Sequence, residues 1–241
     1  MHIYCINLEK RTDRRDNAKL EFEKHNLTVE FFPATDGRIE TPPGIFVHPA
    51  EYGCTDSHVR IWKDIVEKNH KISLILEDDV FLDSNFNSKL DQIINEVKDI
   101  EWDLIHLGPI IPTEKTMATE SLYWGESLGT HAYIISLECA KKISQFDSKI
   151  YKSTVDFQLN KFPLKILCSI DVLVKQESID GHPLIGLLKS GLNGDIGLKR
   201  TIDFDYFIRL GFLNYNLTTK IIILIIVILI IFGIHNLIHR R

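Results

Sequence analysis

Residues 72–80 (ISLILEDDV) decide the fold, because a short, continuous apolar run ends there in three acidic residues. The run at 72–76 is too short for a typical helix and is typical of a central strand covered on both faces. Glu77, Asp78 and Asp79 follow at its carboxyl end. Ligands of open α/β sheets bind at that end, so we expect a site there, with an exposed acidic turn as the alternative.

Apolar runs and helical spacing alternate on both sides of this stretch. Thr12 or Asp13 is expected to cap a helix that ends near His25, and Thr55 or Asp56 a helix that ends near His70. The order predicts an α/β fold with a mostly parallel central sheet flanked by helices. The expected strands are 2–8, 29–32, 72–76, 102–107 and 132–136, with short ones near 166 and 172. Two further helices are expected, one with Phe86, Leu90, Ile93 and Val97 on its apolar face and one with Ala140, Ile143 and Phe146.

The C-terminal part differs from the rest. Residues 221–234 are an unbroken apolar run of 14 residues, followed by HNLIHRR at 235–241. A helix that spans a bilayer needs about 20 residues, and the run approaches this length when it is extended to Ile238. We therefore expect a single-pass C-terminal membrane anchor over 221–238, with a buried core helix as the alternative. The predicted organisation is a catalytic domain over 1–195, a linker over 196–220 and this anchor. Basic residues flank both ends, so the side of the membrane stays open.

Composition excludes some classes of protein. Twenty-eight Lys and Arg against 33 Asp and Glu give a net charge of -5, which makes nucleic acid an unlikely partner for this chain. The four cysteines have no paired spacing, which argues against a zinc site and a disulfide framework. We therefore expect reduced, mostly buried thiols. The carboxylate oxygens after residue 76 suit Mn²⁺ or Mg²⁺ better than zinc.

Six motifs in order carry a family resemblance: INLEKRTDRR (6–15), FFPATDG (31–37), EYGCTDSHVRIW (51–62), LILEDDV (74–80), GTHAYIIS (129–136) and VDFQL (155–159). Together they resemble glycosyltransferase family 25, which includes bacterial lipooligosaccharide galactosyltransferases and collagen hydroxylysine galactosyltransferases. The resemblance implies a GT-A type nucleotide-diphospho-sugar transferase fold, a UDP-sugar donor and transfer with inversion.

The motifs also assign expected roles to residues. Asp79 and Glu77 are the expected ligands of Mn²⁺ or Mg²⁺, and Asp156 is the expected general base, with helix capping as its alternative. Ser57 and His58 are placed in the first turn of a helix that begins at Thr55, where backbone N–H groups favour an anion. The full expected donor-binding set is Asn7, Arg11, Arg14, Ser57, His58, Glu77, Asp78, Gly129 and Thr130.

The function that follows is transfer of a hexose, galactose by resemblance, from a UDP-sugar to an acceptor hydroxyl. The acceptor is a glycan, a lipid-linked saccharide or hydroxylysine, and the sequence does not choose among them. Two alternatives stay open: a non-catalytic membrane protein of the same fold that binds sugar or nucleotide-sugar, and a nucleotidyltransferase.

Overall fold

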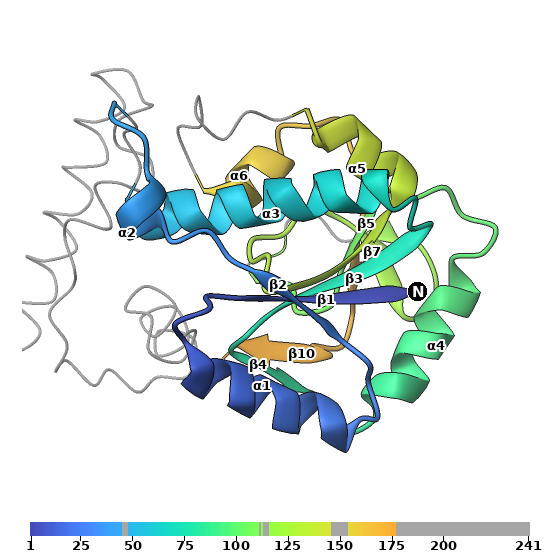
Figure 1. The fold of residues 1–241 in the computed structure, drawn as a ribbon. Coiled ribbons are helices and arrows are strands. Elements are labelled where there is room, and N and C mark those ends of the chain that lie inside the picture. The colour runs from blue at the N-terminus through green and yellow to red at the C-terminus, as the bar shows by residue number, and fades with distance from the viewer. Residues whose placement is uncertain (45–47, 111, 113–115, 146–153, 177–241) are drawn as a thin grey trace, which may run out of the picture. The chain divides into compact units, whose positions relative to one another are not determined.

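The computed structural model describes residues 1–44, 48–110, 112, 116–145 and 154–176 (Figure 1). All of them belong to one compact unit, Met1–Asp180. The predicted linker and the predicted C-terminal helix lie outside the described residues, so the membrane anchor stays a prediction. In the part of the chain that is described, no helix is both long and apolar enough to cross a bilayer.

A mixed central sheet organises the described residues, with the strand order β2-β1-β3-β8-β5-β9-β7-β6. The bounds are β1 His2–Asn7, β2 Glu30–Pro33, β3 Ile72–Glu77, β5 Leu104–His106, β6 Thr116–Met117, β7 Leu122–Trp124, β8 Ala132–Ser136 and β9 Ile166–Ser169. The predicted ISLIL strand is β3, and it lies between β1 and β8 as a central strand should. The segment after residue 110 supplies β6 and β7, which are not among the expected strands.

The expectation of a mostly parallel sheet is wrong, because three strand pairs of this sheet are parallel and four are antiparallel. Pairs β1–β2, β1–β3 and β5–β9 are parallel. Strand β8 runs antiparallel to both β3 and β5, and β7 is antiparallel to both β6 and β9. The apolar run of β8 fits a buried central strand in either direction, so its residues do not reveal its orientation.

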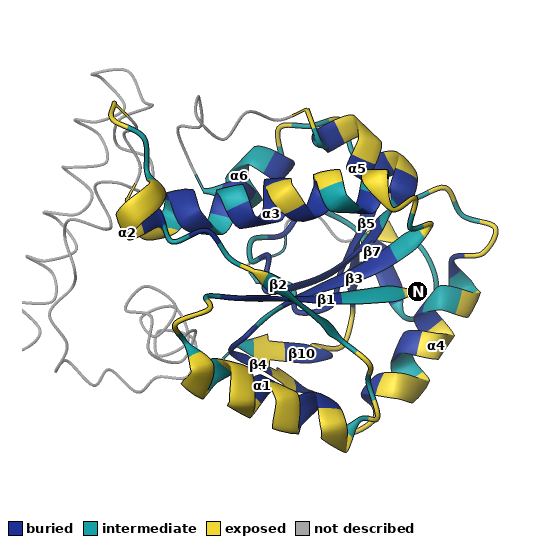
Figure 2. Ribbon diagram, in the orientation of Figure 1, coloured by how far each residue is buried: buried dark blue, intermediate teal, exposed yellow. Residues whose placement is uncertain are grey.

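Helices cover both faces of the sheet (Figure 1). On one face lie α3 (Pro49–Glu67), α5 (Leu137–Ile143) and α6 (Val155–Leu159); on the other lie α1 (Thr12–Lys24) and α4 (Phe86–Glu96). The core is correspondingly divided into two apolar clusters, one per face. Strand β3 serves both, because Leu74 and Leu76 pack in one cluster and Ile75 in the other. Figure 2 shows the buried faces of these helices turned toward the sheet.

Two predicted helix starts are wrong. No side chain caps α1, whose N-cap is Arg11 rather than Thr12 or Asp13. Helix α3 begins at Pro49, six residues before Thr55, and His48 closes a capping box with Glu51. A short helix, α2 (Gly37–Glu40), precedes it. A histidine cap followed by proline at the first helical position is a start signal that the Thr/Asp rule overlooks.

A two-stranded antiparallel ribbon follows the acidic residues. Strand β4 (Val80–Leu82) pairs with β10 (Val174–Gln176), and the register sets Gln176 opposite Val80. The ribbon therefore brings the end of the described chain back to the acidic triplet.

Candidate active site

The site is built where β1 and β3 end side by side. These strands are parallel, with Ile6 paired with Glu77, so the residues that follow each strand meet at the same edge of the sheet. Asn7 and Asp78 are both buried there, and Asn7 Nδ2 donates a hydrogen bond to Asp78 Oδ2 at 2.7 Å. The same amide donates to the carbonyl of Arg11 at 3.2 Å. Asn7 thus ties the acidic loop to the start of α1.

Arg14, in the first turns of α1, supplies positive charge to the triplet. One guanidinium nitrogen lies 3.0 Å from Asp78 Oδ1 and 3.3 Å from Asp79 Oδ2. Arg11 behaves differently, since it forms a two-bond pair with Asp13 at the exposed surface, at 2.9 and 2.7 Å. Of the two predicted arginines, only Arg14 contacts the acidic triplet in the structure.

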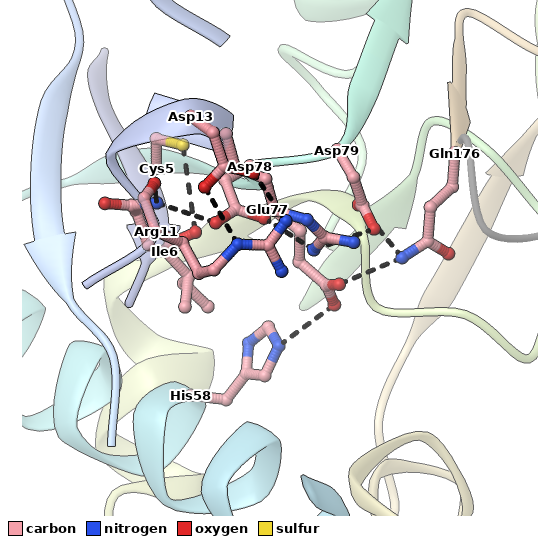
Figure 3. Close-up of polar contacts among 11 residues, drawn as sticks. Cys5, Ile6, Arg11, Asp13, His58, Glu77, Asp78, Asp79 and Gln176 are labelled. Atoms are coloured by element: carbon pink, nitrogen blue, oxygen red, sulfur yellow. Dashed lines mark hydrogen bonds and ion pairs between the residues drawn. The ribbon is translucent and has the colours of Figure 1, made fainter. Parts of the chain in front are cut away.

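Gln176 joins the outer two carboxylates of the triplet. Its Nε2 donates to Glu77 Oε2 at 3.0 Å and to Asp79 Oδ1 at 3.1 Å (Figure 3). One oxygen of Glu77 and one of Asp79 therefore converge on a single donor, as two ligands of one cation would. Sequence reasoning assigned no chemical role to Gln176.

The charges within the triplet are only partly balanced. The pKa of Asp79 is raised to about 6, first by burial and then by the negative charge of Glu77, against which Arg14 acts. Burial also works to raise the pKa of Glu77, but the His58 ring and the positive charges of His131 and Arg14 lower it on balance. This edge of the sheet therefore carries more negative charge than its neighbours neutralise, which favours a cation.

His58 lies in the body of α3 rather than in its first turn. Its ring is fully buried, with Nδ1 2.8 Å from the Tyr133 hydroxyl, and Trp62 Nε1 donates to the same hydroxyl at 2.9 Å. These contacts turn Nε2 toward Glu77 Oε1, 3.8 Å away (Figure 3). The predicted helix-terminal anion site at His58 is therefore wrong, and its neighbour in the site is the Glu77 carboxylate.

Ser57 is a structural neighbour of the site. Its hydroxyl donates to the carbonyl of Gly53 at 2.6 Å and accepts from the backbone N–H of Thr35 at 2.9 Å. Gly53 is required there, because a Cβ on it would lie 2.6 Å from the Thr35 carbonyl and 2.8 Å from the nitrogen of Gly37. The close approach fixes α2 and the β2 end against α3. The helix-terminal role expected for Ser57 is also wrong, since α3 begins at Pro49.

A cavity of about 390 Å³ opens beside the triplet. It is bounded by the end of β1, the start of α1, α2 and the first half of α3. Basic groups from Lys10, Arg11, Arg14 and Arg38 line it together with the carboxylates of Asp36, Glu77 and Asp78. Lys10 pairs with Asp36 across the opening. A cavity with four basic side chains at one end of a sheet suits a phosphate-bearing ligand.

Gly129 and Thr130, in the loop before β8, lie near Asp156 and Cys54 respectively. Gly129 has φ +88°, a left-handed backbone that favours glycine, and its N–H donates to Asp156 Oδ2 at 3.3 Å. Asp156 also accepts from its neighbours Thr154 and Phe157, at the start of α6. The capping alternative for Asp156 is wrong, because the N-cap of α6 is Thr154 and no side chain caps the helix. The Gly129 contact joins Asp156 to the loop before β8.

The described residues contain one group of three potential metal ligands whose ligand atoms all lie within 4.8 Å of one another: Cys54, His58 and Glu77. The acidic triplet itself is not such a group, because Asp78 turns toward Asn7 and Arg14. Glu77 and Asp79 remain as a pair of carboxylates. The sequence assigned no site role to Cys54, which was expected to be a packed thiol. In the sequence, the only sign that Cys54 and His58 lie close together is their spacing of four residues, which is one helical turn.

Comparisons with known proteins agree with the motifs. The model of glycosyltransferase family 25, described as an LPS biosynthesis protein family, matches residues 1–159, so the chain belongs to that family. A "Glycosyltransferase 25 family member" of Aedes aegypti is 33% identical over 172 residues, covering 59% of this chain and 27% of the relative. "Procollagen galactosyltransferase 1-B" of Xenopus laevis is 28% identical over 172 residues, covering 58% and 27%.

One Bos taurus relative, 29% identical over 166 residues (58% of this chain, 28% of the relative), is named "Probable inactive glycosyltransferase 25 family member 3". A crystal structure of the galactosyltransferase LgtC with donor and acceptor sugar analogues is 13% identical, covers 70% of this chain and 73% of its own, and gives a TM-score of 0.41. The chain spans about a quarter of the length of these curated relatives.

Proposed function

We propose that the chain transfers a hexose, galactose in the first instance, from a UDP-sugar to an acceptor hydroxyl with inversion, on a GT-A type fold. One observation carries the proposal: the acidic triplet lies at the ends of β1 and β3, beside a cavity lined by four basic side chains. Membership of glycosyltransferase family 25 and the galactosyltransferase name of one relative support the donor. The acceptor classes remain a glycan, a lipid-linked saccharide or hydroxylysine.

The residues fit a divalent ion of the Mn²⁺ or Mg²⁺ type. Glu77 and Asp79 present oxygens that converge on Gln176. Burial and the negative charge of Glu77 raise the pKa of Asp79, and a bound cation would offset both effects. Magnesium-type ions use one or two carboxylates together with substrate phosphates. Glu77 and Asp79 would hold the ion, whose chemistry there is to neutralise charge on the departing diphosphate.

The protein's own groups bind and orient the donor. Arg14 is fixed by Asp78 with its guanidinium at the cavity edge, where it can also pair with a phosphate oxygen. Arg11 and Lys10 line the same cavity from the loop after β1 and the start of α1. Gly129 and Thr130 are proposed to contact the sugar from the loop before β8, with His58 and Ser57 forming the cavity wall.

Asp156 is proposed as the base that accepts the proton of the acceptor hydroxyl. Gly129 N–H, the Thr154 hydroxyl and Phe157 N–H orient its carboxylate. Substitution Asp156→Asn keeps this shape and removes the proton acceptor, so it should lower turnover and leave UDP-sugar binding intact. Equal losses of binding and turnover would favour a structural role for Asp156 instead.

Turnover is the experiment that tests the proposal. UDP release from UDP-galactose, UDP-glucose and other UDP-sugars is measured with Mn²⁺, with and without saccharide and hydroxylysine acceptors. Acceptor-dependent UDP release supports the transferase. The Bos taurus relative favours a second candidate, a binding protein without turnover, which would bind UDP-sugar and release no UDP with any acceptor. Preference for a nucleoside triphosphate would identify a nucleotidyltransferase.

We also propose that residues 221–238 anchor the chain to a membrane, because residues 221–234 are an unbroken apolar run and basic residues flank the segment. Protection of residues 1–180 from protease in sealed vesicles would report the side on which they lie. Recovery of the full chain in the soluble fraction without detergent would contradict the anchor.

A further inference from the structure

Cys54 and His58 lie one helical turn apart on α3, on the same side of the helix. Glu77, at the end of β3, faces them, and the ligand atoms of all three residues lie within 4.8 Å of one another. Sulfur, imidazole nitrogen and carboxylate oxygen form a donor set typical of zinc rather than of Mn²⁺ or Mg²⁺. The proposed role of Glu77 and Asp79 in transfer does not account for Cys54.

The His58 ring is held in the orientation that a ligand needs. Its Nδ1 is fixed against the hydroxyl of Tyr133, which Trp62 also contacts. Metal-binding histidines commonly use their second ring nitrogen in this way, which fixes both tautomer and ring direction. The ring therefore directs Nε2 toward Glu77, and the tautomer with its proton on Nδ1 is the one that would offer the Nε2 lone pair to a metal.

The atom aimed into the cluster has no hydrogen bond. His58 Nε2 is fully buried and, within the described residues, finds no hydrogen-bond partner. Its nearest ion-pair partner, Glu77 Oε1, is 3.8 Å away, which is too long for a hydrogen bond. Two ligands bound to one zinc at about 2.0–2.2 Å are separated by roughly 3.4 Å in a tetrahedron. The observed gap is close to that separation.

The electrostatic surroundings favour a cation. The carboxylate of Glu77 belongs to the cluster, and those of Asp156 and Asp79 act on Cys54 through their negative charges. The same carboxylates attract a dication. Binding of the dication would release the thiol proton, since the thiolate is the ligand.

We propose that Cys54, His58 and Glu77 form a zinc-binding site with a fourth position open to water. Zinc binding at these three residues does not require that the chain transfers a sugar. It shares Glu77 with the Glu77–Asp79 pair, so zinc competes there with the ion that serves the donor.

Cobalt titration tests the site directly. Full-length protein stripped of metal is titrated with Co²⁺, which replaces zinc and reports a bound thiolate through a near-ultraviolet charge-transfer band. The expected result is one Co²⁺ per chain with that band, which an equivalent of Zn²⁺ abolishes. Cys54→Ala should remove the band, whereas Cys139→Ala, which alters another free thiol buried in α5, should keep it.

Two results would overturn the zinc site: no thiolate band in the wild-type chain, or an equal band in Cys54→Ala. Thermal melting of both variants shows that each is folded. Glu77→Gln provides a second readout that leaves the thiol in place. It should keep the thiolate band and weaken Co²⁺ binding at least tenfold, and unchanged affinity would contradict the assigned ligand set.

Discussion

Helices α3 and α4 cover opposite faces of the sheet, and they do so with different chemistry. Helix α4 buries only apolar side chains, Phe86, Leu90 and Ile93. The second half of α3 does the same, but its first half buries Thr55, Ser57 and His58. Buried polar groups cost free energy unless they are bonded. Ser57 and His58 have such bonds, to Thr35 and Tyr133, at the edge of the cavity.

The difference indicates that the core under α4 serves packing alone, whereas the core under the first half of α3 also shapes a site. Replacing apolar residues of α4 should change stability alone, whereas residues around the first half of α3 and the acidic triplet should change binding and turnover. Substitutions in the two regions test this separation.

The largest effect is expected for Asp79→Asn. Loss of an ion ligand and of a charge at the leaving group should lower UDP release by about 10³-fold or more. Asp91→Asn, on the exposed side of α4, is the matched control and should be silent. Turnover in Asp79→Asn within tenfold of the wild type would contradict the role of Asp79.

The same variant should be more stable than the wild type at pH 7 when no metal is present. The folded-state pKa of Asp79, about 6, lies above its unfolded value near 3.9, so ionisation costs the folded protein stability as pH rises from about 4 to 6. The uncharged amide of the Asp79→Asn variant escapes this cost. Thermal melts should show the two proteins converging near pH 4 and separating at pH 7.

Ile93→Ala should cost about 2–4 kcal/mol in the free energy of unfolding, because it opens a cavity beneath α4. Turnover at a temperature where both proteins are folded should be unchanged. Urea unfolding and UDP release are measured on the same sample. A tenfold loss of turnover per folded molecule would break the separation between the two helices.

His106, on β5, makes the α3 side of the core sensitive to acid. Burial and the neighbouring His131 lower its pKa to about 4, from 6.5. Above pH 6.5 the ring is neutral in both states, and stability is lost as pH falls from 6.5 toward 4, by at most about 3 kcal/mol. His106→Gln should flatten that part of the pH profile of unfolding. An unchanged slope would show that other groups cause it.

Arg14→Lys should weaken UDP-sugar binding by roughly tenfold, because an ammonium does not reproduce the planar guanidinium that contacts Asp78 and is proposed to pair with a phosphate. Arg15→Lys is the control, since Arg15 is exposed and stacks over Phe31 outside the cavity. Equal affinity in the two variants would remove Arg14 from the site.

Local patterns predicted much of this fold. The apolar run of β3, the amphipathic α4 and the strand at β8 were all identified from period and composition. The orientation of β8 was not, because a central strand buried on both faces has the same composition whichever way it runs. The start of α3 was missed because its cap is a histidine.

In the site, too, some residues could be predicted from the sequence and others could not. The acidic triplet was found because it follows a strand, and Asn7 and Arg14 were found through the family motifs. Gln176 reaches the triplet only through the pairing of β4 with β10, residues almost a hundred positions apart. The sequence also argued against zinc because its cysteines lack paired spacing. The proposed cluster takes a single cysteine and completes its ligand set from α3 and β3.

We propose above all that the ends of β1 and β3 bind a nucleoside diphosphate together with a divalent ion. Calorimetric titration of the full-length chain with UDP, in Mn²⁺ and in excess chelator, tests it most directly. We predict that Mn²⁺ tightens UDP binding by at least tenfold and that Asp79→Asn abolishes this gain. Equal UDP affinity with and without Mn²⁺, or the same gain in Asp79→Asn, would contradict it.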